Sequence, residues 1–501
     1  MRRIPSELLD QLDLDTAIDE EAQSWRNQVP PEPWTQAIAS NKSSVEAWIR
    51  TRLATGLVAT PNVAVNVRKS SLGTRPVPIM GILERVVYRA LTSYVIGPAL
   101  VPDRSAEAYR EFLYGPISHA FTNAQTWWPS QVSLKYIVEA DIAAFYQYVD
   151  HDVLRLELEL QTGKVEGIDF LMELLAETQQ RSFGIPQFID TSDWLSEIYI
   201  RIVERELVRY GWPVWRYNDD FRIGCRDYTE ALNAIERLDE SARSIGLTVS
   251  DYKTRTPSFT TYFLRNTGLN ISDTTIGIDP TDVDVIIVDY EALSEDQIEA
   301  AIATLRRTHG ESTDDDPINL KRVTRAQVRD LRRAISSLTS HKDASGLDFV
   351  MDLLVFIPSL TPRVCDYLIA IGSDEHQQQV AQIFDDVLAN ISLGEWQALW
   401  FTYVCRKLRL LGKQSRLRWL AGQRDRGRGR PLGAEAALAL AEAGVADFDD
   451  LNRALRSEPE ALAPWYLLGM KSMAIADLVN YGNRARAVRD SSRFNRILLD
   501  M

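Results

Sequence analysis

The chain has 501 residues, of which 45% are hydrophobic and 25% charged, and its formal net charge at pH 7 is −14. This apolar content excludes a disordered chain, and the length suggests about two to four domains. No run of about 18 apolar residues occurs, so we expect no membrane span. Three scattered cysteines form neither a disulfide framework nor a zinc motif, and the expected location is the reducing cytoplasm.

The two halves of the chain differ in pattern. In the first half, short apolar strands, turns and helices alternate, with Pro and Gly between them. In the second half, apolar residues recur at intervals of three and four, which predicts helices of about 10–16 residues with short connections. We therefore predict an α+β fold, with a mixed domain over residues 1–275 and an all-α, repeat-like domain over residues 276–501.

Three aspartates in the first half are the strongest candidates for a reactive site. A short apolar run, LKYIVEAD, predicts a strand that ends at Asp141. Farther along, VWRYNDDFRIG predicts a β-hairpin whose tight turn contains Asn218, Asp219 and Asp220. Adjacent carboxylates repel one another. The pair is therefore either a solvated turn or half of a cation site that is completed by a third carboxylate.

Asp141 is the candidate for that third carboxylate. Carboxylate oxygens are hard ligands that suit Mg²⁺, which keeps several waters and accepts phosphate oxygens at its remaining positions. Two such ions about 3.5–4 Å apart activate a 3′-hydroxyl and stabilise a leaving pyrophosphate. The pattern predicts a two-Mg²⁺ site with Asp141, Asp219 and Asp220 as ligands, and with Mn²⁺ as the alternative ion. The interpretation as a solvated turn stays open at this point.

Further elements surround these aspartates, and their order resembles that of the reverse transcriptase family. DIAAFY resembles the first palm motif, GIPQFIDTSDWL the second, RYNDDF the tyrosine-x-Asp-Asp box, and GLTVSDYKT the motif that follows it. RKSSLGTRPVPI together with ERVVYRAL resembles the fingers segment. The resemblance covers about residues 50–260, and its strength lies in five elements in order. It implies that residues 1–275 form a fingers-palm domain.

Within that family, the second motif and the long helical tail are similar to defence-associated bacterial reverse transcriptases of the abortive-infection type. Those enzymes carry a helical, HEAT-like C-terminal domain. The resemblance implies a DNA polymerase that acts against phage, either copying an RNA or working without a template on a protein primer. The partners it implies are dNTPs, RNA or single-stranded DNA product, a non-coding RNA, and further copies of the chain in a homo-oligomer.

The resemblance also assigns roles to single residues. Asp141, Asp219 and Asp220 match the metal ligands, and Tyr146 matches the aromatic gate whose ring would clash with a ribose 2′-hydroxyl. Four further residues match groups that bind the nucleotide, namely Lys69 and Arg75 of the fingers, Gln187 near the sugar, and Lys253 beside the hairpin. The alternatives are a core aromatic for Tyr146, a solvated hairpin for the two fingers cations, and a structural ion pair for Lys253.

One position departs from the family pattern. Phe188 stands where templated members of the family commonly have Gly. A bulky ring at this position favours an enzyme whose template is restricted or absent.

A basic segment lies in the otherwise acidic second half. Residues 403–430 contain ten Lys or Arg and one acid. Such segregation favours a cationic stripe along a phosphate backbone, with Trp419 available to stack on a base, and a solvated helix face is the alternative. The candidate nucleic-acid contacts are Arg416, Arg418, Arg424, Arg426, Arg428 and Arg430. Trp396, Trp400 and Trp465 lie on apolar helical stripes and are predicted to be core residues.

Two other functions stay open. One is a general reverse transcriptase of retron or group II intron type. Two features disfavour it: the DTS sequence of the second motif, and the lack of a recognisable maturase sequence. The other is a non-catalytic, polymerase-like scaffold that binds RNA. Three acidic residues in matching motifs disfavour the scaffold, because an idle scaffold has little need of clustered carboxylates.

Overall fold

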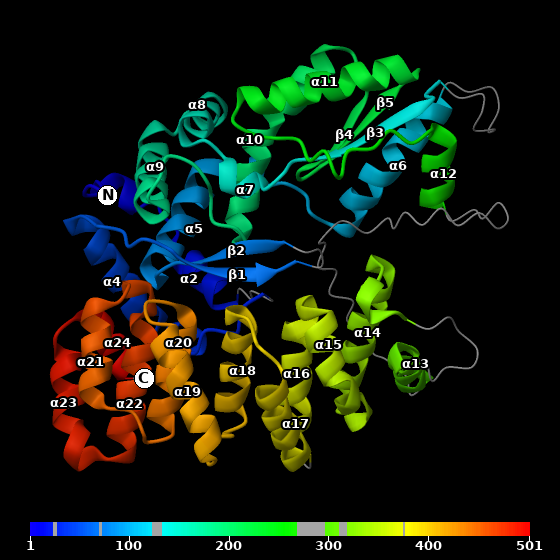
Figure 1. Cartoon of the computed structure of the whole chain (residues 1–501). Helices are drawn as coiled ribbons and strands as arrows, with labels where there is room; N and C mark the ends of the chain where they lie inside the picture. The colour runs from blue at the N-terminus through cyan, green and yellow to red at the C-terminus, as the bar shows by residue number, and fades with distance from the viewer. Residues whose placement is uncertain are drawn as a thin grey trace. The chain divides into compact units, whose positions relative to one another are not determined.

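The computed structural model describes residues 1–23, 28–69, 73–122, 133–267, 296–309, 318–373 and 376–500 (Figure 1). The chain forms two compact units, and each is assembled from separate stretches of sequence. Unit 1 contains Met1–Asp13, Leu53–Ala59 and Val87–Pro280, and unit 2 contains Leu14–Arg52, Thr60–Val86 and Thr281–Met501. The predicted domain boundary between residues 275 and 276 lies outside the described residues.

A three-stranded antiparallel sheet is the centre of unit 1. Its order is β3-β5-β4, and its strands are β3 (Tyr136–Asp141), β4 (Val214–Tyr217) and β5 (Asp220–Cys225). β3 is buried along almost its whole length, because helices cover both faces of the sheet. Figure 1 shows α11 (Tyr228–Ser244) along one face and α6 (Ala106–Thr122) with α12 (Phe259–Thr267) along the other. The predicted strand that ends at Asp141 is confirmed.

The other helices of unit 1 begin and end where the local sequence favours it. Asp150 caps α8 (His151–Thr162), because its carboxylate accepts hydrogen bonds from the main-chain N–H groups of Asp152 and Val153. Gly246 follows α11 with a φ of 80°, a backbone conformation that glycine adopts without strain. The remaining helices of this unit are α1 (Ser6–Leu9), the 3₁₀ turn η1 (Pro98–Leu100), α7 (Phe145–Tyr148), α9 (Val165–Gln179) and α10 (Asp190–Arg209).

Unit 2 joins a two-stranded hairpin to the long helical part of the chain. The hairpin consists of β1 (Val63–Arg68) and β2 (Thr74–Ile79) in antiparallel register, with Val67 opposite Arg75. β1 contacts α18 of the helical part. The N-terminal helices of this unit are α2 (Leu14–Gln23), α3 (Thr35–Ser40), α4 (Lys42–Thr55) and α5 (Ile82–Ile96), and the last two also contribute residues to unit 1.

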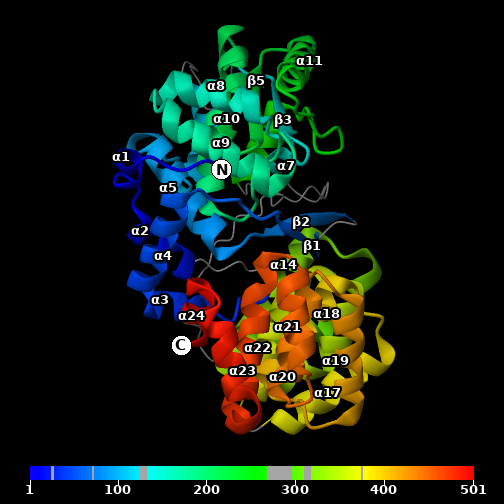
Figure 2. The same ribbon diagram turned by 90° about the vertical axis from the view of Figure 1, so that its left-hand side faces the viewer.

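The helical part of unit 2 is an array in which alternate helices touch. α14 contacts α16, α16 contacts α18, α18 contacts α20, and α20 contacts α22, and Figure 1 shows these helices side by side. Figure 2 shows the same array from the end formed by α21–α24. The helices are α13 (Asp296–Arg306), α14 (Arg325–His341), α15 (Val350–Phe356), α16 (Thr361–Gly372), α17 (Gln377–Asn390), α18 (Glu395–Lys407), α19 (Gln414–Arg426), α20 (Pro431–Glu442), α21 (Phe448–Ser457), α22 (Ala463–Ala476), α23 (Leu478–Asp490) and α24 (Arg493–Leu499).

Short 3₁₀ turns connect several of these helices, at Arg307–His309, Leu320–Arg322, Ala344–Phe349, Pro358–Leu360 and Glu460–Leu462. Trp396, Trp400 and Trp465 are buried, which confirms the prediction that they belong to the core. Over the described ranges the protein is mostly helical with two small antiparallel sheets, in agreement with the predicted α+β class. None of the helices described is long and apolar enough to cross a membrane.

Candidate metal centre

The register of the central sheet brings the three predicted aspartates together. Asp141, the last residue of β3, is directly opposite Asp220, the first residue of β5. Tyr217 of β4 is also opposite Asp220, so the turn of the hairpin consists of Asn218 and Asp219 alone. The predicted turn was one residue too long, because a two-residue loop already closes the hairpin. Asn218 has a φ of 54°, which asparagine tolerates better than most residues.

The three carboxylates form a cluster that fits a small divalent cation. One oxygen from each of Asp141, Asp219 and Asp220 lies within 4.8 Å of the others. Oxygen ligands at about 2.0–2.1 Å from an octahedral Mg²⁺ are themselves about 3–4 Å apart, so small side-chain adjustments are enough to enclose an ion. The donor set consists of hard oxygens only, which suits Mg²⁺ or Mn²⁺.

The electrostatics of the cluster also favour a cation. Burial, together with the nearby carboxylates of Asp219 and Asp141, raises the pKa of Asp220 to about 8, against the opposing effect of Arg222 and Lys253. Ionising two neighbouring carboxylates in such a small space is energetically unfavourable, because like charges repel. A bound divalent ion would replace this repulsion by attraction and would ionise the whole set.

Lys253 lies directly beside the cluster. Its Nζ atom is 3.1 Å from Oδ1 of Asp141, and the two form an ion pair. The main chain supports this contact, because the N–H of Ser250 donates to the carbonyl of Asp141 at 2.7 Å. The structure thus contains the ion pair that was the alternative interpretation for Lys253, and its role in binding the nucleotide stays a prediction.

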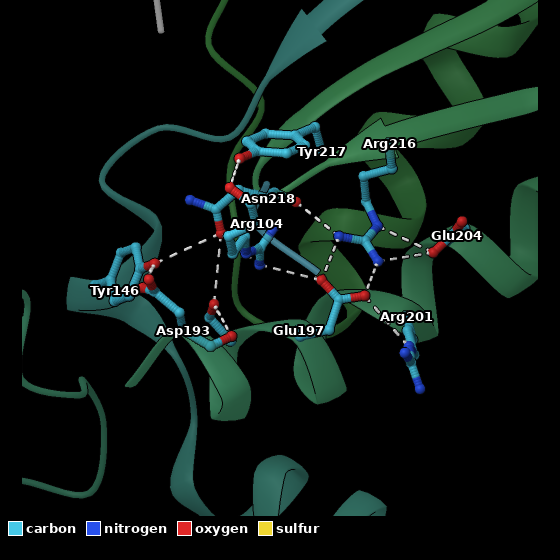
Figure 3. A network of polar contacts seen from close by, with 10 residues as sticks. Arg104, Tyr146, Asp193, Glu197, Arg201, Glu204, Arg216, Tyr217 and Asn218 are labelled. Atoms are coloured by element: carbon cyan, nitrogen blue, oxygen red, sulfur yellow. Dashed lines mark hydrogen bonds and ion pairs between the residues drawn. The ribbon is translucent and has the colours of Figure 1, made fainter. Parts of the chain in front are cut away.

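Tyr146 lies on α7 with its ring buried and its hydroxyl directed toward the hairpin (Figure 3). The hydroxyl donates a hydrogen bond to Asp193 of α10, and its oxygen is 3.5 Å from Oδ1 of Asn218. Burial raises the pKa of Tyr146 well above its usual value, with Asp193 adding to the rise. Burial likewise raises the pKa of Asp193. The candidate gate is therefore a neutral phenol held in place by a buried carboxyl group.

Gln187 and Phe188 belong to the loop that precedes α10. The main chain fastens this loop to the segment that carries Tyr146, because the N–H of Ile185 donates to the Tyr146 carbonyl at 2.8 Å. Phe188 has a φ of 66°, in the left-handed region that favours glycine. Phe188 therefore has a backbone conformation that glycine would adopt with less strain. Gln187 is partly buried, and its role at the sugar stays a prediction.

Lys69 and Arg75 lie on the β1–β2 hairpin, where Lys69 is exposed and Arg75 is partly buried. The main-chain N–H of Lys69 donates to the carbonyl of Gly73 at 3.1 Å. Both residues belong to unit 2, whereas the aspartates belong to unit 1. Their action on a triphosphate stays a prediction.

The basic segment divides into buried and exposed members. Arg416 is buried on the face of α19 that also carries Leu420 and Gln423, since residues spaced by three and four share one helix face. Its guanidinium pairs with Asp385 at 2.7 Å and donates to the carbonyl of Ala381 at 2.9 Å. Of the others, Arg424 is partly buried, and Arg418, Arg426, Arg428 and Arg430 are exposed.

Several exposed or partly exposed members have partners of their own. Arg424 pairs with the neighbouring Asp425 at 3.0 Å, and Arg430 pairs with Glu395. Such exposed pairs contribute little to stability and exchange readily for other anions. The geometry therefore leaves these side chains accessible to phosphate groups, while Arg416 is held inside the helical array.

Sequence reasoning missed a polar network beneath the hairpin (Figure 3). Its members come from the segment before α6, from α10 and from the β4–β5 hairpin, and they are Arg104, Asp193, Ser196, Glu197, Arg201, Glu204, Arg216 and Asn218. One signal was present in the sequence: Glu197, Arg201 and Glu204 recur at helical spacing among apolar residues of α10. That spacing places them on one face, but does not identify their partners.

No protein-family model and no curated protein matches the chain. Among solved structures, it is similar to a telomerase from Candida tropicalis in complex with the TWJ fragment of telomeric RNA, with 13% identity and a TM-score of 0.32 over 75% of this chain and 70% of that one. The corresponding complex from Candida albicans gives 11% identity and a TM-score of 0.30 over 72% and 63%. Telomerase is a reverse transcriptase-related enzyme. Both TM-scores are below 0.5, and neither similarity assigns a function to this chain.

Proposed function

We propose that the chain is a DNA polymerase of the reverse transcriptase type that adds dNTPs by phosphoryl transfer at Asp141, Asp219 and Asp220. The observation that carries this proposal is the sheet register, which places Asp141 opposite Asp220 and next to Asp219. Three carboxylate oxygens within 4.8 Å of one another match the needs of a Mg²⁺ centre. The motif order in the sequence supplies the polymerase context.

Each residue has a distinct part in the proposed reaction. The three aspartates would hold the ions, which activate the attacking hydroxyl and stabilise the leaving pyrophosphate when bound. Lys253 neutralises Asp141 in the ion-free site and becomes available to a phosphate oxygen once a cation takes over that charge. The ring of Tyr146 would occupy the space of a ribose 2′-hydroxyl, so deoxynucleotides are preferred. Gln187 is proposed to lie near the sugar.

The wider proposal follows the resemblance of the motifs. Residues 1–275 act as fingers and palm, with Lys69 and Arg75 at the triphosphate, and residues 276–501 act as a HEAT-like domain. That domain binds RNA or single-stranded DNA product through Arg418, Arg424, Arg426, Arg428 and Arg430, and assembles a homo-oligomer. The enzyme serves antiphage defence, and Phe188 at the glycine-like position favours synthesis with a restricted or absent template.

The test is incorporation of labelled dNTPs by the purified full-length protein with Mg²⁺, with and without RNase treatment. The proposal predicts incorporation in the wild type and none in Asp219→Asn. Loss of incorporation after RNase treatment would identify a copied RNA. Incorporation that survives RNase, with label retained on the denatured protein, would identify template-free, protein-primed synthesis.

A negative result is equally informative. If neither the wild type nor Asp219→Asn incorporates any dNTP with Mg²⁺ or Mn²⁺, the polymerase proposal is wrong. The chain would then be a polymerase-like scaffold, and any nucleic acid that co-purifies with it would identify what it binds.

A further inference from the structure

A buried arginine lies beneath the turn that carries Asp219. The side chain of Arg216, on β4, is only 5% exposed, and its guanidinium lies between two carboxylates of α10 (Figure 3). Its Nε atom is 3.0 Å from Glu204, and its Nη1 atom is 3.0 Å from Glu197. Nη1 also donates to the main-chain carbonyl of Asn218 at 2.9 Å. The guanidinium therefore joins a rigid helix to the first residue of the turn.

Glu197 is the fixed point of this arrangement. Its side chain is 9% exposed, and it receives Arg216, Arg104 at 3.2 Å and Arg201 at 3.3 Å. A buried carboxylate needs this many donors, because an unpaired charge away from water is strongly unfavourable. Cations from β4 and from the segment before α6 are thereby held on one side chain of α10.

Arg104 approaches the same turn from the other side. Its Nη2 atom is 3.4 Å from Oδ1 of Asn218, and its main-chain carbonyl accepts a hydrogen bond from the hydroxyl of Tyr217 at 3.0 Å. The guanidinium of Arg104 also lies over the Tyr217 ring, 5.3 Å from its centroid. Both residues that precede Asp219 are therefore fastened to the network.

This arrangement explains how Asp219 keeps its place. Asp219 lies beside the carboxylates of Asp141 and Asp220, so charge repulsion would push the turn away from the cluster if no other contact held it. We infer that Arg216, oriented by Glu197 and Glu204, is a positioning residue that holds the turn so that Asp219 shares a cation with Asp141. The inference rests on the proposed metal site and names the residues that preorganise it.

The test compares Arg216→Lys with the matched control Arg201→Lys. Both changes keep the positive charge beside Glu197. Lysine, however, lacks the planar fork that reaches two carboxylates and the turn together. Arg201 is 36% exposed, and among the described residues it forms no hydrogen bond or ion pair with the hairpin. A purely structural role would therefore affect both variants through stability alone.

Mn²⁺ binding to the full-length protein, followed by electron paramagnetic resonance without nucleotide, is the readout, with thermal unfolding measured in parallel. We expect Arg216→Lys to weaken Mn²⁺ binding about 10-fold or more, in the range known for residues that support metal ligands. Arg201→Lys should stay within about twofold of the wild type. Equal Mn²⁺ affinity in both variants, at temperatures where both are folded, would overturn the inference.

Two further measurements keep the outcome decisive. If Arg216→Lys does not fold, Glu204→Gln tests the same guanidinium more gently, since Glu204 is partly exposed, and a severalfold loss of Mn²⁺ affinity is expected. Unchanged affinity in Glu204→Gln would then count against the inference. Two results would show that the proposed metal site is absent: no Mn²⁺ binding by the wild type, or equal Mn²⁺ binding by Asp219→Asn and the wild type. The proposed function would then be wrong as well.

Discussion

Two buried arginines, one in each unit, each form ion pairs with two glutamates. They differ in the other groups that they contact. Arg216 lies between Glu197 and Glu204 in unit 1. Arg406 lies between Glu435 and Glu442 in unit 2, with Glu435 also accepting a hydrogen bond from Trp465 at 2.7 Å. Both guanidinium groups are at most 8% exposed.

The two sites differ in what the arginine holds. Arg406 connects α18 to α20 within the helical array, whereas Arg216 also donates to the carbonyl that precedes Asp219. A buried ion pair by itself is weak evidence of function. What distinguishes unit 1 is that its ion pair is joined to the turn that carries Asp219 and leads directly into Asp220. The following predictions test that distinction.

Asp219→Asn carries the largest expected effect on activity. Removing one ligand from a centre that needs all three should reduce dNTP incorporation at least about 100-fold. The thermal midpoint should stay equal or rise, because one of three repelling charges is gone. Incorporation and thermal unfolding measured on the same preparation check both points. If Asp219→Asn still incorporates dNTPs, Asp219 is not a required metal ligand, and the network beneath it has no more functional meaning than the ion pair of Arg406.

Arg406→Ala should be the most damaging change to stability. It leaves Glu435, whose side chain is 2% exposed, as a buried charge without its main cation, and the expected loss is about 3–5 kcal/mol in the free energy of unfolding. Denaturant titration followed by the fluorescence of the buried tryptophans measures it. Mn²⁺ affinity of the still-folded protein should not change. A metal defect comparable to that of Arg216→Lys would contradict the comparison.

Tyr146→Ala should relax the choice of sugar. Without the ring, a ribose 2′-hydroxyl meets open space, so discrimination between dNTPs and rNTPs should fall about 10–100-fold. The ratio of kcat/KM for the two nucleotides is the measurement. Tyr146→Phe is the control: it keeps the ring, loses the hydrogen bond to Asp193, and should retain most of the selectivity. If discrimination is the same in the wild type and Tyr146→Ala, the ring is only a core residue.

Asp366→Asn, on α16, should show a purely electrostatic effect in unit 2. Burial raises the pKa of Asp366 to about 6, above the value of about 3.9 in an unfolded chain. Ionisation therefore disfavours the fold, with a penalty that is absent below about pH 4 and complete above about pH 6. The variant should be up to about 3 kcal/mol more stable than the wild type at pH 7.5 and equal to it at pH 4. Urea unfolding at both pH values is the check.

Neutralising Arg418, Arg426 and Arg428 should have the smallest effect, confined to nucleic-acid binding. If each contacts one phosphate, the slope of the logarithm of affinity against the logarithm of salt concentration should fall by about one per residue. Binding of labelled single-stranded RNA at several salt concentrations measures the slope. An unchanged slope would mean that these arginines are only solvated surface residues. They would then make no contact with the RNA backbone.

The core of the candidate site was predictable because its constraints are local. An apolar run specifies β3, the Asn-Asp turn specifies the hairpin, and a buried antiparallel sheet then allows few registers. The assignment of Asp141, Asp219 and Asp220 to one cluster used these elements together with the resemblance of their motifs to the reverse transcriptase family. The core positions of the three tryptophans followed in the same way from helical spacing.

Other features depend on contacts that no local pattern encodes. Arg416 and Arg418 read alike in the sequence, yet one is buried against Asp385 and the other is exposed. Two partners of Glu197, Arg104 before α6 and Arg216 on β4, lie outside α10, so spacing on that helix could not identify them. The interleaving of the two units likewise depends on which faces meet in three dimensions.

The acidic cluster depends on the register in which β3 pairs with β5. Because side chains alternate between the two faces of a strand, a slip of one residue would send Asp141 to the opposite face from Asp220 and scatter the acidic cluster. Chains that fold with the wrong alignment would thus be inert rather than partly active. The proposed nucleotide-joining activity would therefore require the correct register of β3 and β5.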